Sequence, residues 1–122
     1  MAQKIIDPVN DGTSITLTGP LLDSLGTPIP NSSVTSALMS MHTRKGTVVG
    51  TLNNVNVISD IDANGIFSRE FTSAEMSMID GNQPSRRNEI HIVTIKVVAL
   101  ISGSTETITE SVWIEIKNLR HI

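Results

Sequence analysis

The strongest structural signal in the chain is a pair of runs rich in Val, Ile and Thr in its last third, Glu89–Leu100 and Thr105–Lys117. A four-residue loop that contains Gly103 separates them, and this spacing predicts a β-hairpin. The first run is apolar on both faces, which predicts a strand in the middle of a sheet or under a covering layer. One face of the second run carries branched apolar residues and one acid: Ile108, Glu110, Val112, Ile114 and Ile116.

The composition favours a single all-β domain. A chain of 122 residues can bury a core without disulfides or metals. Hydrophobic residues make up 39% of the chain and aromatic residues only 2%, so Ile and Val dominate, and branched residues favour strands. Charged residues account for 17%, below the roughly 25% typical of soluble domains. We therefore expect a surface rich in Ser, Thr and Asn, which is common in extracellular and virion β-proteins.

Charge and cysteine content exclude several classes of function. The formal net charge of -3 argues against a nucleic-acid partner, because duplex binders present a basic face. The absence of Cys excludes thiol catalysis and thiolate metal sites. The first eight residues lack the basic and apolar regions of a signal peptide, and no apolar run approaches the roughly 18 residues of a membrane span. We expect a soluble protein made without a signal peptide and without a membrane partner.

Polar turn residues separate short strand-like runs along the chain. Residues 1–12 are expected to form an N-terminal arm, residues 13–118 a β-sandwich and residues 119–122 a C-terminal tail. The strands expected before the hairpin are Ile15–Thr18, Val34–His42, Thr47–Leu52, Val55–Ile58 and Ile66–Phe71. Seven or eight short strands at this spacing predict an antiparallel β-sandwich.

Two local signals refine this prediction. Gly19 and Pro20 interrupt the first strand, which predicts an edge strand with a bulge or a switch between sheets. Thr72 and Glu75 have the spacing of a capping box. The sequence therefore predicts one short helical turn near residues 72–78.

The segment Asp60–Gly65 repeats the first half of a calcium-binding loop, with oxygen-bearing residues at alternate positions before a Gly. The full pattern requires a carboxylate six residues after that Gly, and Phe71 stands there. A β-turn in which Asn64 and Gly65 supply positive φ angles explains the same residues, and we favour it.

The remaining polar residues predict no catalytic centre. His42, His91 and His121 occur in none of the spacings typical of metal ligands, and the chain has no G-x-S-x-G elbow. We therefore expect a non-enzymatic protein with no catalytic, cofactor-binding or metal-binding residues and no cofactor.

Several residues are candidates for contacts with other proteins. Trp113 belongs to the core if its Thr-rich strand face is the inner one, which we favour, and is an anchor for a partner if that face is exposed. The arm is expected either to fray or to become ordered against a neighbour, and the pair Arg86-Arg87 is either a solvated loop tip or faces an acidic subunit. The candidate interface residues are Ile5, Ile6, Arg86, Arg87, Trp113 and Ile122.

The order of turns resembles a known family. The Asp23–Ile29 turn, the Asp62–Phe67 turn and the segment Phe71–Met76 resemble immunoglobulin-like modules of tailed-bacteriophage virion proteins and related bacterial surface domains. The similarity spans roughly residues 13–118, without the Cys pair and corner Tyr of many antibody-like modules.

This resemblance implies an immunoglobulin-like β-sandwich that decorates a capsid or belongs to a neck or tail. Its implied partners are capsid, portal, neck or tail subunits, bound through the arm, the Ile79–Asn88 loop and the C-terminal tail. The implied assembly is a homo-oligomer or many copies on a lattice, and the implied location is the virion after synthesis in the host cytoplasm. The alternative function is a carbohydrate-binding or receptor-binding β-module, with calcium at Asp60, Asp62 and Asn64, and a small hydrolase is a weaker third interpretation.

Overall fold

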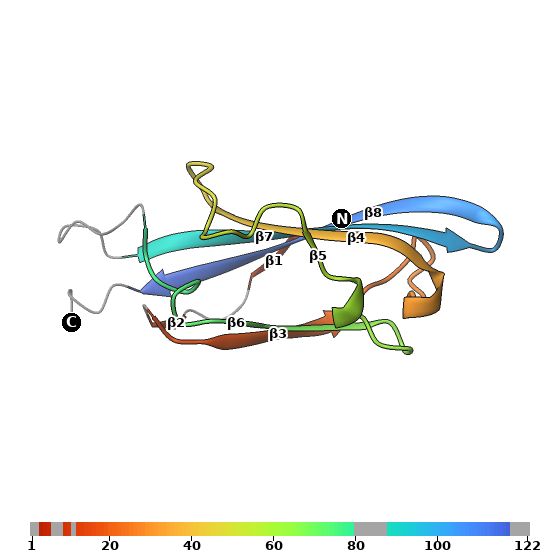
Figure 1. The fold of residues 1–122 in the computed structure, drawn as a ribbon, viewed down its shortest axis with the longest axis horizontal. Helices are drawn as coiled ribbons and strands as arrows, with labels where there is room; N and C mark the ends of the chain where they lie inside the picture. Colours follow the sequence, from red (N-terminus) through yellow and green to blue (C-terminus); the bar gives the residue numbers. More distant parts are fainter. Residues whose placement is uncertain (1–2, 6–8, 11, 80–87, 118–122) are drawn as a thin grey trace.

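The computed structural model describes residues 3–5, 9–10, 12–79 and 88–117, which form an all-β sandwich. Its strands are β1 (Gln3–Ile5), β2 (Val9–Asn10), β3 (Ile15–Pro20), β4 (Val34–Thr43), β5 (Val55–Asn56), β6 (Ile66–Phe71), β7 (Asn88–Ile101) and β8 (Ser104–Lys117). Two short 3₁₀ helices, η1 (Asn31–Ser33) and η2 (Ile58–Asp60), complete the fold. Figure 1 shows two layers, with β4, β7 and β8 in one and β3 and β6 in the other. No helix in these residues is long and apolar enough to cross a membrane.

The hairpin predicted from the sequence is confirmed. Strands β7 and β8 pair antiparallel without interruption from Asn88 opposite Lys117 to Ile101 opposite Ser104. Ser102 and Gly103 form the connecting turn with φ angles of 52° and 81°. Positive φ at both central residues is the geometry of a type I′ turn, whose twist matches that of the flanking strands.

Strand β7 lies in the middle of the larger sheet, as its two apolar faces predict. The strand order in that sheet is β1-β8-β7-β4-β5, with β2 also paired to β8. The inner faces of the three long strands bury Ala37, Met39, Met41, Val93, Ile95, Val97, Ala99, Ile108, Val112, Ile114 and Ile116. Phe67 and Phe71 of β6 meet this layer from the smaller sheet and are 2% and 0% exposed. Apolar burial between the two layers therefore supplies the main stabilisation of the fold.

The smaller sheet consists of β3 and β6. Their antiparallel register runs unbroken from Ile15 opposite Phe71 to Pro20 opposite Ile66, so the predicted bulge or sheet switch at Gly19-Pro20 is absent. The predicted edge position is correct, because β3 pairs with β6 alone among the described strands. Pro20 is tolerated there since an edge strand leaves one side of its backbone unpaired.

Two parts of the expected N-terminal arm are strands. Gln3–Ile5 pairs with Ser111–Trp113, and Val9–Asn10 pairs with Ile116–Lys117. Both pairings are parallel, so the larger sheet is mixed rather than purely antiparallel. The described parts of the arm thus add to the same edge of β8.

The segment between β4 and β6 departs from the predicted strands. Thr47–Leu52 is an irregular connection with one bridge, between Val48 and His42, because Gly50 adopts a φ of 56° and turns the chain. The predicted strand Val55–Ile58 ends at Asn56, whose Oδ1 accepts the N–H of Ile58 at 3.0 Å and starts η2.

The expected helical turn at residues 72–78 is one hydrogen-bonded turn. Thr72 N–H donates to Glu75 Oε1 at 2.9 Å, and Glu75 N–H donates to Thr72 Oγ1 at 3.2 Å, which is the reciprocal pattern of a capping box. Met76 N–H also donates to the Thr72 carbonyl at 3.0 Å. A single turn of this kind is too short to be a helix.

Candidate functional site

The outer face of the larger sheet carries a row of large side chains across its three long strands. Ile92 of β7 is in register with His42 of β4 on one side and with Trp113 of β8 on the other. All three side chains are half-buried, and they alternate with residues that point into the core. We call His42, Ile92 and Trp113 the outer-face row.

The structure therefore corrects the core placement favoured for Trp113. Its strand neighbours Val112 and Ile114 are the buried ones, so the Thr-rich face of β8 is the outer face. The guanidinium of Arg44 lies 5.3 Å from the centre of the Trp113 ring, within the range of a cation–π contact. Trp and Arg are the residue types most enriched at binding hot spots.

A tight turn positions Arg44 over this row. Thr43 N–H donates to the Thr47 carbonyl at 2.9 Å, Gly46 N–H donates to the Thr43 carbonyl at 2.9 Å, and Thr47 N–H donates to Thr43 Oγ1 at 3.2 Å. The connection between β4 and β5 rises above the sheet on the side away from β3 and β6 (Figure 1). The turn thus places an exposed cation on the outer face beside an aromatic ring.

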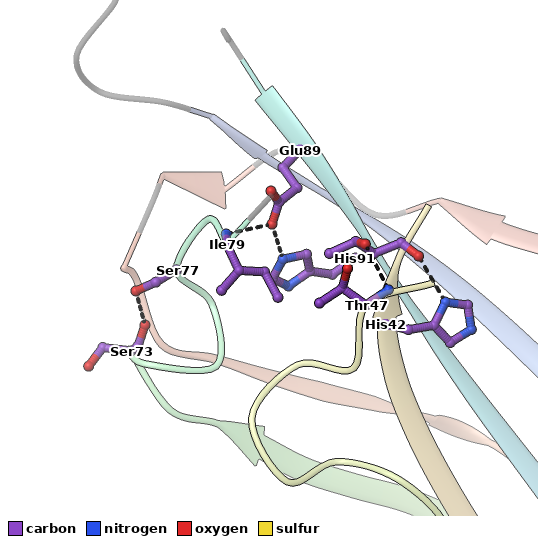
Figure 2. Close-up of polar contacts among 8 residues, drawn as sticks. His42, Thr47, Ser73, Ser77, Ile79, Glu89 and His91 are labelled. Atoms are coloured by element: carbon purple, nitrogen blue, oxygen red, sulfur yellow. Dashed lines mark hydrogen bonds and ion pairs between the residues drawn. The ribbon is translucent and has the colours of Figure 1, made fainter. Parts of the chain in front are cut away.

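Beneath this face, one end of the core holds a buried polar pair. His91 Nε2 lies 2.6 Å from Glu89 Oε2, and the two residues are 0% and 4% exposed (Figure 2). The same oxygen accepts the N–H of Ile79 at 2.9 Å, which ties Ile79 to the start of β7. Because Oε2 acts as an acceptor, the contact is an N–H···O bond donated by His91. This pair is too deeply buried to meet a substrate and serves to position the chain.

The described histidines lie on opposite faces of the sheet. His91 points into the core, whereas His42 lies on the outer face and donates from Nδ1 to the Thr43 carbonyl at 3.0 Å (Figure 2). They cannot share a metal ion, and His121 is outside the described residues. In residues 3–5, 9–10, 12–79 and 88–117 no group of three His, Cys, Asp or Glu side chains is placed to hold a metal.

The Asp60–Gly65 segment forms a β-turn, as we favoured, with Gly65 N–H donating to the Asp62 carbonyl at 3.1 Å. Gly65 has the expected positive φ of 79°, but Asn64 does not have a positive φ, so that part of the prediction was wrong. Asp62 Oδ1 accepts the N–H of Asn64 at 2.8 Å and the N–H of Ile66 at 2.9 Å. Asp60 Oδ2 lies 3.1 Å from Arg69 Nη1 in an ion pair. One oxygen of Asp62 thus closes the turn, and one oxygen of Asp60 is held by Arg69.

This arrangement leads to a prediction about calcium. We expect the melting temperature to be the same in millimolar calcium and in a chelator. A calcium ion that bound the folded protein through Asp60 and Asp62 would compete with the turn hydrogen bonds of Asp62 and the ion pair of Asp60. A bound ion at about 100 times its Kd would add about 2.7 kcal/mol. Differential scanning fluorimetry with magnesium as the control ion measures the effect, and a rise specific to calcium would contradict this assignment.

The structure places only some of the candidate interface residues. Ile5 lies in β1, in register with Trp113 of β8, so these two positions are adjacent. Ile6, Arg86, Arg87 and Ile122 lie outside the described residues. Arg44 and the Glu89–His91 pair were not identified from the sequence.

Comparison of the chain with known proteins identifies no family. No protein-family model matches the chain, and no curated protein sequence matches it either. What the chain binds is therefore inferred from the geometry of its outer face and of its strand edges.

Proposed function

We propose that the chain is a non-enzymatic structural protein that binds neighbouring protein subunits through the outer face of its larger sheet. The observation that carries this proposal is Trp113, half-buried on a face that no described strand or helix covers, beside Ile92 and under the guanidinium of Arg44. A sheet face with an aromatic ring and an adjacent Arg has the composition of a protein-binding hot spot.

The virion of a tailed bacteriophage is the setting that we propose for this protein. The resemblance of its turns to immunoglobulin-like virion modules supports that setting, as does the low charge content of 17%. Partner subunits would be copies of this chain or other capsid, neck or tail proteins. Repetition on a lattice makes such contacts effective, because many weak contacts made together give high avidity.

Self-association is the first test of the outer face. We expect light scattering over a concentration series to show a dimer or larger assembly, and we expect Trp113→Thr to weaken its formation by at least about tenfold, which is about 1.4 kcal/mol. Thr preserves the strand preference at this position, so the fold is expected to remain.

Leu100→Thr is the matched control for this experiment. Leu100 is 52% exposed and lies on β7 at the far end of the hairpin from the outer-face row. Its replacement removes apolar surface but leaves Trp113 and Arg44 in place. Equal weakening by the two substitutions, or a chain that stays monomeric at every concentration, would contradict self-association through Trp113.

A further inference from the structure

An apolar groove opens on the side of the sandwich between β3 and β8. Leu17, Phe67, Ile95 and Val112 contribute apolar side chains to its lining, and Glu110 contributes a carboxylate. The cavity volume is about 100 Å³. An engineered apolar cavity of about 150 Å³ binds benzene. The groove therefore has room for one apolar side chain rather than for a larger free ligand.

One side of the groove is formed by the edge of β3 that does not pair with β6. Leu21 N–H donates to the Gly65 carbonyl at 2.9 Å, which makes this residue pair a hydrogen-bonded one. Hydrogen-bonded and non-hydrogen-bonded pairs alternate along an antiparallel ladder. Thr16 and Thr18 consequently direct their backbone N–H and C=O groups away from β6, toward the open edge.

The other side of the groove adjoins the first half of β8, at the edge of that strand that faces away from β7. The two-residue turn makes Ile101 and Ser104 a hydrogen-bonded pair, so by the same alternation Thr105, Thr107 and Thr109 direct their backbone groups away from β7. Within the described residues, β1 and β2 pair only with positions 111–113 and 116–117 of this edge. No described strand pairs with the segment from Ser104 to Glu110 on this side, so it is the stretch of β8 at which another strand could add.

Two carboxylates stand beside this free edge on the inner face of β8. Glu106 and Glu110 flank Ile108 at a spacing of two residues, and both are half-buried. Their partners in register on β7 are Ala99 and Ile95, which offer no charge. In the described part of the chain neither carboxylate has a hydrogen bond or ion pair. The inner face of this edge therefore carries an acid, an apolar residue and an acid at alternate positions of the strand.

We propose that this edge of β8, at the end of the groove, binds an extended segment of a partner protein in which an apolar residue is flanked, two residues away on each side, by Lys or Arg. Such a segment would pair with the backbone of Thr105–Thr109 as an added strand. Its apolar side chain packs on Ile108, one inner-face position along β8 from Glu110 at the end of the groove, and its two cations meet Glu106 and Glu110. The pattern is symmetric, so it fits a parallel or an antiparallel strand.

The same carboxylates explain why the edge would select this partner. Charges that point inward at a sheet edge keep apolar strands from adding to it, because an added strand would bury them unpaired. A strand that brings its own cations removes this penalty. The groove is distinct from the outer-face row, and the proposal does not depend on self-association through Trp113.

The test uses the full chain and a fluorescent seven-residue peptide, Thr-Lys-Thr-Val-Thr-Lys-Thr, with fluorescence anisotropy as the readout. We expect this peptide to bind and its counterpart with Glu in place of Lys not to bind. Glu110→Gln is expected to weaken binding about tenfold, as loss of a charge-assisted contact does. Glu70→Gln removes the same charge from an exposed position on β6 and is expected to leave binding unchanged.

Two further measurements keep the test decisive. Glu110→Lys is expected to abolish the preference for the Lys peptide over the Glu peptide, because Glu106 and the new Lys then attract and repel each peptide once. The amides of Thr105, Thr107 and Thr109 are expected to gain protection from hydrogen exchange when the Lys peptide binds to the unchanged protein. Equal binding of both peptides, or equal effects of Glu110→Gln and Glu70→Gln, would overturn the proposal in favour of unspecific attraction. Peptide binding that is lost as the chain self-associates would overturn it in favour of a second copy of the chain at this edge.

Discussion

Replacing Gly65 by Ala is expected to destabilise the protein by about 4 kcal/mol. Two costs add at this position: the strain of a positive φ angle and the clash of the new Cβ with the backbone of Ile29. Gly65 has a φ of 79°, a conformation that costs an L residue about 1–2 kcal/mol. A Cβ at this position would lie 2.8 Å from the backbone nitrogen of Ile29 and 2.9 Å from its carbonyl oxygen. Both distances are below any normal contact, so the backbone of one segment must move.

Movement of the backbone at Gly65 or Ile29 disturbs a network of main-chain hydrogen bonds. Leu21 N–H donates to the Gly65 carbonyl at 2.9 Å, and Ile29 N–H donates to the Leu21 carbonyl at 2.8 Å. Leu21 and Ile29 are 2% and 1% exposed, so any bond lost between them leaves a buried group unpaired. A loss of about 4 kcal/mol is a large share of the 5–15 kcal/mol by which domains are stable.

Gly103→Ala separates the two contributions. Gly103 has a φ of 81°, but a Cβ built there has no atom within 4 Å. We expect this variant to lose only about 1–2 kcal/mol, the cost of the φ angle alone. Urea unfolding followed by circular dichroism measures both variants. Equal losses would mean that the approach of Ile29 to Gly65 contributes nothing.

The hairpin and the central position of β7 could be predicted from sequence because both depend on local patterns. Alternating Val and Ile residues define strands wherever they occur, and Ser102-Gly103 meets the backbone requirement of a two-residue turn. The edge position of β3 was likewise predictable, because Pro20 lacks the N–H that a central strand needs.

The features that could not be predicted depend on contacts between distant segments. The alternation in β8 shows that Trp113 and Val112 face opposite ways, but it does not show which layer covers which face. Thr47–Leu52 has the residues of a strand, yet the left-handed Gly50 prevents a continuous ladder with β4. The parallel pairing of Gln3–Ile5 with β8 has no local signal at all.

The candidate site was predicted only in part for the same reason. Trp113 stood out as a lone Trp on a polar strand face, whereas Arg44 comes over it through a turn on another strand. Glu89 and His91 have a spacing of two, which places them on one strand face, and that face carries the apolar residues Val93 and Ile95. A polar pair at alternate positions on an apolar face was the available signal for a buried contact.

Breaking the Glu89–His91 pair is expected to have the second largest effect. His91→Phe keeps a ring in the space of the imidazole but leaves the Glu89 carboxylate buried without its 2.6 Å contact. A buried pair that loses one partner typically costs about 3–5 kcal/mol, and we expect a loss of about 3 kcal/mol. Glu89→Gln retains an oxygen that can accept from both His91 and Ile79, so its cost is expected to be about 1 kcal/mol.

A more exposed ion pair provides the control. Asp60 and Arg69 have side chains that are 25% and 26% exposed, so solvent screens their interaction. Asp60→Ala is therefore expected to cost about 1 kcal/mol or less. An equal loss for Asp60→Ala and His91→Phe in urea unfolding would show that burial does not set the strength of the Glu89–His91 contact.

A double-mutant cycle then isolates the interaction between Glu89 and His91. Glu89→Leu alone leaves the His91 N–H without an acceptor in the core, and His91→Phe alone takes one donor from the buried carboxylate, which keeps the N–H of Ile79. The double variant replaces the pair by two apolar side chains, as is often tolerated in protein interiors. The Ile79 N–H loses its Glu89 acceptor equally in Glu89→Leu and in the double variant, so this loss cancels in the cycle. We expect the double variant to be more stable than the sum of the single losses by about 2 kcal/mol. Additive losses would mean that the two side chains stabilise β7 independently, and the short contact between them would then have no energetic consequence.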